Sequence, residues 1–460
     1  MRRLAVVGGG IAGLAAAWFA AERGFDVVVL EASARVGGKL RVTEVGGVPV
    51  DVGAEALLAV RPEGVGLLDA AGLADDRIAP LTTSAHIRAG GQLFALPTRT
   101  MLGIPGDPVA ARASGVLSEQ ALAAITGEPS LPPLAPVVDD IAVGSLVRAR
   151  LGDEVADRLV EPLLGGVYAG RADQLSLRAT MPALARRLAG GGSLVEAAAA
   201  VAGSGTRSPD AGPVFASLRG GLGRLPGVLA ASGRFEVRTS VTVRSIRRTE
   251  IGFALETGAE PVAELVDADA VIVAAPAAKA ARLLRDLAAG AAGELAAIES
   301  ASLATVSFAF DDVTPPEGSG LLVAAGERLA VKALTMTSRK WPVESGNLTL
   351  LRVSVGRVGE PQALQFDDAD LVRLVRGELR TLTGIAAEPV DAVVTRWGGG
   401  LPQYAVGHVE RIARVRGSIA TVPGLAVCGA AYDGVGVPAC IGSARDAVAR
   451  IIASLPPRGQ

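Results

Sequence analysis

The sequence predicts a mixed α/β fold that combines a parallel sheet assembled from separated segments, an antiparallel sheet and a helical lobe. An apolar strand, a glycine turn, a helix and a second strand open the chain at residues 4–31. A similar strand, glycine turn and helix close it at residues 425–453. Between these ends, helical patterns dominate residues 98–213 and alternating strand patterns dominate residues 302–358.

The opening unit has the features of a dinucleotide-binding turn. Its first strand ends at Val7, and glycines follow at positions 8, 10 and 13 before an alanine-rich helix. The first glycine permits a tight turn, the second lets a pyrophosphate approach the backbone, and the third lets the helix pack closely on the strand. The N-terminus of the helix would face the phosphates. Glu31 ends the second strand 18 residues after Gly13, where a ribose hydroxyl needs an acceptor.

The same stretch has two other interpretations. Met1–Arg3 followed by the uncharged residues 4–21 is also compatible with a signal peptide or a membrane anchor. Three adjacent glycines suit an apolar signal core poorly, and 18 residues are few for a membrane span. Because neither alternative explains the second strand or Glu31, the dinucleotide site is the preferred interpretation.

Composition narrows the class of protein. A chain of 460 residues is too long for one simple core, so two or three lobes are expected. A net charge of −2 gives no reason to expect nucleic-acid binding. Two cysteines cannot form a disulfide framework, and two histidines, His86 and His408, exclude a histidine-rich metal site. We therefore expect reduced thiols in a cytoplasmic protein, no metal, and chemistry carried by a cofactor, and we name no catalytic residue.

Further glycine turns favour FAD over NAD. Gly37 and Gly38 follow Glu31 and offer more close backbone approach, and Gly53 follows a short strand. An NAD-binding unit would normally continue with another strand and helix at this point. The turn at 434–438 is a second phosphate-friendly start of a helix, far from the first. A Rossmann-type FAD-binding domain assembled from several separated segments accounts for both turns.

The elements between the two glycine turns alternate between sheet and helix. The loop at 165–170 interrupts the helical lobe, either as a turn that ends a helix or as a loop beside a ligand. The apolar strand at 269–276 is typical of a buried parallel sheet. The other expected elements are a hairpin at 86–97, a helical stretch at 143–164, a strand and glycine turn at 215–226 leading into a helix, paired strands at 235–246 and 252–255, and helices at 368–383 and 441–453.

Residues 4–55 resemble the FAD fold shared by amine oxidases, phytoene desaturases and porphyrinogen oxidases. Three further stretches, at 160–170, 335–342 and 396–408, resemble the porphyrinogen oxidases in particular. With the turn at 434–438, the resemblance runs along nearly the whole chain. It is a resemblance to the bacterial FAD-dependent coproporphyrinogen III oxidase and protoporphyrinogen oxidase family.

The resemblance implies an FAD site with parts for pyrophosphate, ribose, adenine and ring system. The first glycine turn would hold the pyrophosphate, Glu31 the ribose and the Val243 backbone the adenine, while Trp397 would close over the flavin. Val243 is otherwise only a strand residue, and Trp397 only a core residue. The implied cofactor-binding residues are Gly8, Gly9, Gly10, Ile11, Ala12, Gly13, Glu31, Ala32, Lys39, Gly53, Ala54, Glu55, Ala56, Val243, Trp397, Val435, Gly436 and Val437, and the candidate substrate contacts are Tyr168, Leu322 and Met336.

The resemblance also implies a reaction. It is the oxygen-dependent, six-electron oxidation of coproporphyrinogen III to coproporphyrin III in haem biosynthesis, with hydride passing from the substrate to the flavin. Protoporphyrinogen IX is the alternative substrate. An amine oxidase, a carotenoid desaturase-like enzyme or a flavin-binding protein without turnover are further alternatives. The preference for coproporphyrinogen rests on resemblance to forms from high-GC bacteria, not on physics.

The implied organisation has three parts. Residues 1–82, 214–297 and 411–460 would form the FAD-binding domain, residues 83–97 and 298–410 the sheet domain for the substrate, and residues 98–213 the helical lobe. Substrate, oxygen and a transient contact with the next haem-pathway enzyme are the expected partners.

Two positions depart from the family pattern. Ala85, with His86 beside it, stands where the family often has a basic residue that can meet a substrate propionate. Arg88 or another arginine would then have to bind the propionate. Arg171 stands where an aspartate commonly follows the Tyr-Ala-Gly sequence, either as a replacement cation near the site or, preferably, as a surface residue.

Membrane insertion is not expected. Relatives can dock to a bilayer through the helical lobe, but residues 95–167 here contain no Phe, Trp or Tyr. The same span has five arginines against nine acidic residues. Interfacial anchoring depends on aromatic and basic residues, so we expect a soluble protein.

Overall fold

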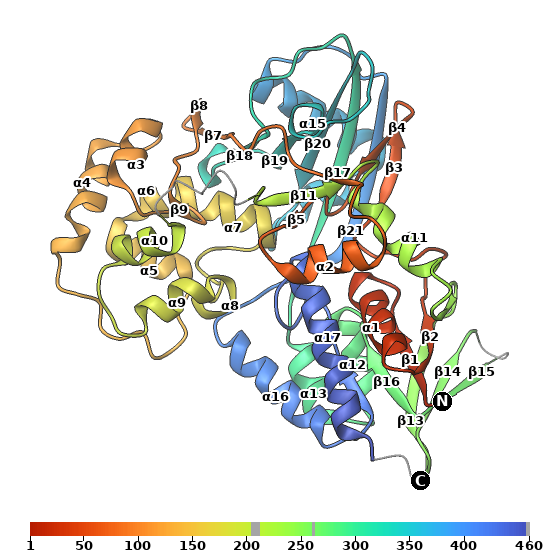
Figure 1. The fold of residues 1–460 in the computed structure, drawn as a ribbon. Coiled ribbons are helices and arrows are strands. Elements are labelled where there is room, and N and C mark those ends of the chain that lie inside the picture. The colour runs from red at the N-terminus through yellow and green to blue at the C-terminus, as the bar shows by residue number, and fades with distance from the viewer. Residues whose placement is uncertain (204–211, 260–262, 457–460) are drawn as a thin grey trace.

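A computed structural model of the chain describes residues 1–203, 212–259 and 263–456 (Figure 1). It contains a parallel sheet, a larger antiparallel sheet and a lobe of helices, which confirms the mixed α/β class. Residues 204–211, at the end of the predicted helical lobe, lie outside the described residues.

The parallel sheet has five strands, and every neighbouring pair in it is parallel. In spatial order the strands are β12 (Glu236–Arg238), β2 (Asp26–Leu30), β1 (Arg3–Val7), β16 (Ala270–Val273) and β22 (Leu425–Val427). Beyond their first residues, the central strands β2, β1 and β16 are apolar because helices or strands cover both of their faces. Val6 and Ile272 face one core, whereas Val7 and Val273 face the other. The sequence-predicted strands at both ends of the chain thus belong to one sheet, with β16 between β1 and β22.

Different elements cover the two faces of this sheet. The first and last long helices, α1 (Ile11–Glu22) and α17 (Val437–Ser454), pack together on one face (Figure 1). The same core includes α2 (Pro62–Ala70) and α11 (Leu225–Ala230). The other face is covered by α12 (Ala277–Leu284), α13 (Ala289–Ala296), α16 (His408–Ala420) and an antiparallel sheet of β13 (Val243–Arg248), β14 (Phe253–Thr257) and β15 (Glu264–Ala268).

The larger sheet has seven strands, antiparallel except for one parallel pair between β18 and β7. In order these are β21 (Asp391–Pro402), β17 (Ser300–Asp311), β20 (Leu348–Val355), β19 (Val331–Met336), β18 (Gly320–Val323), β7 (Ala85–Ala89) and β8 (Gln92–Ala95). The helix α15 (Asp368–Thr383), at the predicted bounds, packs on one face. Phe308 and Val353 belong to that core, so Thr305 and Arg352, at odd spacings along the same strands, point to the opposite face.

The helical lobe packs around a core of its own that also includes Ile87 and Ala89 of β7. Its helices are α3 (Pro108–Ser114), α4 (Glu119–Gly127), α5 (Val143–Leu151), α6 (Asp153–Val155), α7 (Glu161–Tyr168), α8 (Leu177–Thr180), α9 (Pro182–Leu188) and α10 (Leu194–Ala202), with a π-helical turn at Ala156–Val160. The remaining elements of the described residues are β3 (Val42–Val45), β4 (Val48–Asp51), β5 (Leu57–Leu58), β6 (Arg77–Ile78), β9 (Thr100–Met101), β10 (Ile104–Pro105), β11 (Phe215–Leu218) and α14 (Thr337–Lys340), and short 3-10 helices at Glu128–Ser130, Leu222–Arg224, Ala325–Glu327 and Gln362–Gln365.

Three sequence predictions need correction. The last helix begins at Val437 rather than at Ile441, because Pro438 fits the first turn of a helix, where its missing N–H is not needed. The predicted loop at 165–170 is helical as far as Tyr168, and Ala169 ends α7 in a left-handed conformation with φ of 48°. The predicted pairing of 235–246 with 252–255 is confirmed only for β13, which pairs with β14, whereas β12 pairs with β2 in the parallel sheet.

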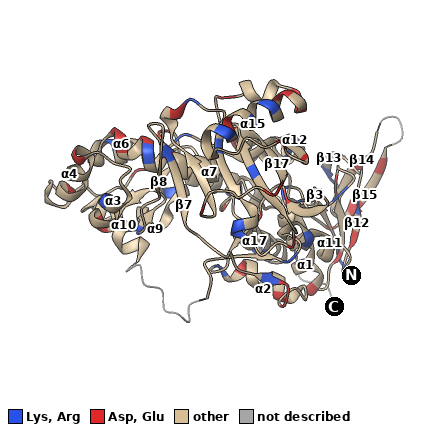
Figure 2. Cartoon of the chain, turned by 90° about the horizontal axis from the view of Figure 1, so that it is seen from above, with Lys and Arg blue, Asp and Glu red and all other residues tan. Residues whose placement is uncertain are grey.

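Charges of both signs are interspersed over the helices and strands (Figure 2). No helix within the described ranges is long and apolar enough to cross a membrane. Within the same ranges, no group of three or more His, Cys, Asp and Glu side chains is arranged to hold a metal ion.

Candidate active site

The first glycine turn is shaped by the absence of side chains. A Cβ on Gly13 would lie 1.9 Å from the carbonyl oxygen of Gly8, and Gly8 itself has a φ of +110°. In contrast, a Cβ on Gly10 would meet no atom of the described residues within 4 Å. The N-terminus of α1 follows directly, and no side chain in the described part of the chain caps Gly10. Free N–H groups beside open space are a suitable site for an anion such as a pyrophosphate.

The acid predicted for the ribose lies at this turn. Glu31 accepts a hydrogen bond of 2.6 Å from the Gly9 N–H through Oε2, and one of 2.8 Å from the Ser33 N–H through Oε1. Ala32, between Glu31 and Ser33, is exposed. The segment before Val243 runs alongside, because the N–H of Val241 donates to the carbonyl of Glu31 at 2.9 Å. Segments more than 200 residues apart therefore meet where ribose and adenine are expected.

The second glycine turn lies beside the first. Gly436 precedes α17, and no described side chain caps that helix. The thiol of Cys428, at the end of β22, lies 3.8 Å from the carbonyl of Ala12 in α1. The start of the chain and its end thus present two helix N-termini side by side. That the two turns belong to one cofactor site stays a prediction.

Gly53 and Trp397, two of the residues predicted around the ring system, lie beside Lys39. Its Nζ donates to the carbonyl of Gly400 at 2.6 Å. A Cβ on Gly53 would lie 1.9 Å from the Lys39 carbonyl and 3.3 Å from the ring of Trp397. Although the Lys39 side chain keeps accessible surface, surrounding protein desolvates the ammonium and lowers the pKa of Lys39, and only the nearby Cys440 opposes this shift.

Two of the three candidate substrate contacts lie close together. A Cβ on Gly166, in α7, would lie 3.6 Å from Leu322 of β18, and Tyr168 ends the same helix. Burial raises the pKa of Tyr168 to about 12, so its hydroxyl stays protonated at neutral pH. The structure does not bring Met336 to them. Its side chain is 1% exposed and faces the core under α15, on the other face of the sheet from Leu322.

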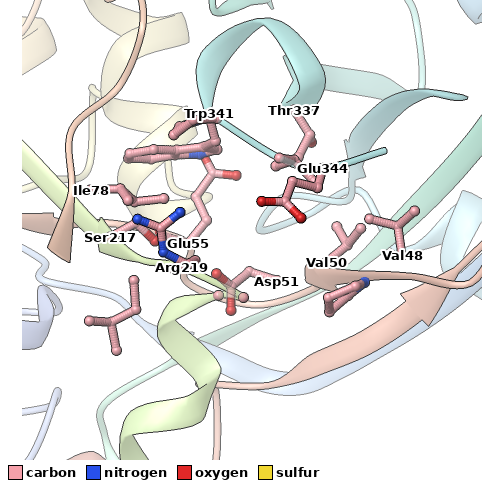
Figure 3. A pocket seen from close by; sticks show the side chains of 16 residues that line it. Val48, Val50, Asp51, Glu55, Ile78, Ser217, Arg219, Thr337, Trp341 and Glu344 are labelled. Carbon is pink, nitrogen blue, oxygen red and sulfur yellow. The ribbon is translucent and has the colours of Figure 1, made fainter. Parts of the chain in front are cut away.

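Glu55 differs from its predicted role beside the cofactor. Its carboxylate pairs with Lys340 at 2.5 Å and with Arg352 at 2.9 Å. These two cations lower the pKa of Glu55 although burial opposes them. Glu55 and Asp51 line a cavity of about 280 Å³ (Figure 3), which is not lined by any residue of the two glycine turns. The Glu55 carboxylate is thus held by protein cations beside a separate cavity.

Sequence reasoning missed the side chains that join these parts. Tyr404 stacks on His408 with ring centroids 4.0 Å apart and lies 5.6 Å from the ring of Tyr168. Its hydroxyl donates to the carbonyl of Ala430, at the second glycine turn, at 2.6 Å. Gln403 donates to the Tyr168 carbonyl at 2.8 Å. The only signal for these roles was their place in the resemblance at 396–408, which assigns no contact.

The sequence of residues 11–452 matches the family of flavin-containing amine oxidoreductases. The chain belongs to this family. The coproporphyrinogen III oxidase of Mycobacterium tuberculosis is 39% identical to it over 99% of this chain and 98% of the relative. The coproporphyrinogen III oxidase of Bacillus subtilis is 31% identical over 97% of both chains.

Solved structures agree with this membership. The crystal structure of a putative protoporphyrinogen oxidase from Exiguobacterium has a TM-score of 0.87 and 33% identity, and the match covers 99% of both chains. A putrescine oxidase shares the fold at a TM-score of 0.66, with 18% identity, over 98% of this flavin oxidoreductase and 99% of its own chain. At that identity the likeness concerns the fold alone.

Proposed function

We propose that this flavin oxidoreductase oxidises coproporphyrinogen III to coproporphyrin III with oxygen as the electron acceptor, as a step of haem biosynthesis. The observation that carries the proposal is the full-length likeness to coproporphyrinogen III oxidases, at 39% identity for the mycobacterial relative. The paired glycine turns support it, because they offer backbone donors and open space to one elongated, anionic cofactor.

FAD is the proposed cofactor, and the chain's own geometry fits it. The pyrophosphate would meet the N-terminus of α1 at Gly10, where there is room for it. Glu31 and Ala32 would meet the ribose, and Val243 the adenine. Lys39, the turn at 53–56, Trp397 and residues 435–437 would surround the ring system.

Bound FAD would accept a hydride from the substrate in each of three rounds, and oxygen would take the electrons from it. The protein has to place the substrate, exclude water and hold the reacting atoms in line. Tyr168 and Leu322 are the proposed walls of the substrate site. Tyr168 remains protonated over the physiological range because burial raises its pKa to about 12, so it contributes a neutral hydroxyl.

The predicted division into an FAD-binding domain, a substrate sheet domain and a helical lobe is part of the proposal. Accordingly, the α7–β18 contact would lie between the helical lobe and the substrate sheet. A soluble protein that meets the next haem-pathway enzyme transiently is also proposed. Co-sedimentation with anionic vesicles at physiological salt would contradict the proposal that the protein is soluble.

One experiment tests the function. Purified protein with bound FAD, given coproporphyrinogen III in air, should gain porphyrin fluorescence and release hydrogen peroxide. The same preparation should be compared on protoporphyrinogen IX, because a bovine relative named protoporphyrinogen oxidase is 29% identical over 99% of this chain. Faster turnover of protoporphyrinogen would make that compound the substrate. Absence of porphyrin from both, with FAD bound, would exclude the proposed function.

A further inference from the structure

The segment Asp51–Ala54 is held through its backbone from two sides. The N–H groups of Val52 and Ala54 donate to the carbonyls of Arg41 and Lys39, at 3.0 and 3.1 Å. These bonds tie the segment to the chain that follows the first glycine turn. The buried carbonyls of residues 51, 52 and 53 also need donors.

Two side chains of the seven-stranded sheet supply those donors. Arg352 of β20 donates to the carbonyls of Asp51 and Gly53 at 2.9 and 2.8 Å. Thr305 of β17 donates to the carbonyl of Val52 at 2.9 Å. The donors come from adjacent strands and from the sheet face opposite α15. Two side chains of this sheet therefore donate hydrogen bonds to the carbonyls of residues 51, 52 and 53.

Side-chain packing does not enclose this segment on every side. The side chains of Asp51 and Glu55 line the cavity of about 280 Å³, as Figure 3 shows, so the segment borders empty space on that side. Arg352 pairs with Glu55 as well, at 2.9 Å. One guanidinium thus makes three contacts around the turn that carries Gly53. A planar fork of donors can serve two carbonyls and a carboxylate at once, which a lysine ammonium cannot match.

We propose that Arg352, assisted by Thr305, is a positioning residue that sets the Gly53–Ala54 turn relative to Trp397. A Cβ on Gly53 would lie 3.3 Å from the Trp397 ring, so a small movement of the turn changes this spacing. The inference rests on the proposed function in that this turn is one wall of the flavin ring site. In this role Arg352 acts on the reaction through the backbone of the turn and touches neither substrate nor cofactor.

The test compares Arg352→Met and Arg352→Lys with a matched control, Arg150→Met. Arg150 is as buried as Arg352, with a side chain 11% exposed in both cases. It likewise binds a buried carboxylate, that of Glu128, and a backbone carbonyl, that of Pro132, but in the helical lobe. Each variant is purified with FAD, and its melting temperature, FAD dissociation constant, visible circular dichroism, kcat and KM are measured.

Both methionine variants should melt at lower temperature than the wild type by similar amounts. Only Arg352→Met should change the visible circular dichroism of the flavin and weaken FAD binding. Its kcat should fall by about 100-fold, the scale expected when a reacting group is displaced by an ångström, with KM changed much less. For Arg352→Lys, the flavin dichroism, FAD affinity and kcat should lie between those of the wild type and of Arg352→Met. The lysine keeps the charge beside Glu55 but loses the planar set of donors.

The outcomes separate the two proposals. If Arg352→Met matches Arg150→Met in flavin dichroism, FAD affinity and kcat, Arg352 is merely structural and the inference is overturned. If the wild type oxidises neither porphyrinogen, the proposed function fails, yet dichroism and FAD affinity still decide whether Arg352 sets the turn. Should Arg352→Met not fold, Thr305→Val gives the same comparison with one donor removed, and an unchanged flavin dichroism in it would contradict the inference.

Discussion

The glycine turn at 8–13 and the segment Asp51–Ala54 both bring backbone to the proposed cofactor site, but different forces fix them. At the first turn side chains are absent, since a Cβ on Gly13 would lie 1.9 Å from the carbonyl of Gly8. At the second segment, side chains 253 and 301 residues away, Thr305 and Arg352, hold the carbonyls. A site built from backbone can thus be specified locally by glycine or remotely by hydrogen-bond donors.

This difference has a consequence for mutation. A glycine cannot be replaced where the added Cβ would overlap backbone atoms, because the backbone cannot move aside. A segment held by remote donors can lose one donor and persist in a shifted position. The expected effects below run from the largest to the smallest and test this contrast.

Gly13→Ala should prevent formation of the first turn. The added Cβ would overlap a carbonyl oxygen, which costs more than the about 1–3 kcal/mol typical of an overpacked core. Gly10→Ala is its control, since Gly10 has a φ of −72° and open space around its Cβ position. That variant should fold with nearly unchanged melting temperature but bind FAD at least about tenfold more weakly, about 1.4 kcal/mol. Equal melting temperatures for Gly13→Ala and Gly10→Ala would show that the first turn tolerates a Cβ at position 13.

Arg357→Met should destabilise the fold by up to about 3–5 kcal/mol, the cost of breaking a buried ion pair, since the other cation near Glu161, that of Arg171, lies 3.7 Å away. Arg357 pairs with Glu161 at 2.8 Å, with side chains 3% and 6% exposed, and joins α7 to the chain after β20. Denaturant unfolding measures the loss. The double variant Glu161→Gln with Arg357→Met should recover part of it, and no recovery would mean that packing, not charge, fixes this contact.

Asp51→Asn should change how stability depends on pH. Desolvation raises the pKa of Asp51 from 3.8 to about 6, although N–H groups of Leu222 and Gly223 donate to its carboxylate. Because the folded pKa is the higher one, the folded state favours the protonated acid. Stability should therefore fall as pH rises from about 4 to about 6, by up to about 3 kcal/mol, and stay level above that.

The variant should lack this component, because its amide does not titrate. The difference in free energy of unfolding between wild type and Asp51→Asn, followed by denaturant titration across that range, isolates it from the other acids. A difference that does not change with pH would show that folding leaves the pKa of Asp51 unchanged.

Thr305→Val should have the smallest effect on stability. It removes one donor and leaves the Val52 carbonyl without its side-chain partner, at about 1–3 kcal/mol. Urea unfolding measures the change. Because Arg352 still holds the carbonyls on either side, FAD should remain bound. Loss of FAD in this variant would mean that the segment tolerates no missing donor and behaves as the glycine turn does.

The sequence alone determined the parts of the protein that rest on local chemistry. Glycines at 8, 10 and 13 indicated a turn because only a missing Cβ permits it, and the apolar run of β16 indicated a buried parallel strand. The helix predicted at 368–383 is confirmed, and in the structure Asp367 caps α15 and Gly384 ends it in a left-handed conformation. Family membership also followed, because motifs at several places had to agree.

Only the tertiary structure decided which face a strand residue takes and which distant groups meet. Met336 and Leu322 looked equivalent in sequence, yet a shift of one residue along a strand reverses the face, and the pairing with β20 turns Met336 into the core under α15. Arg352 carries no local mark of its role. Its contact with Asp51 and Gly53 exists because the larger sheet packs against a segment 301 residues earlier in the chain, a relation set by packing of whole elements and not by neighbouring residues.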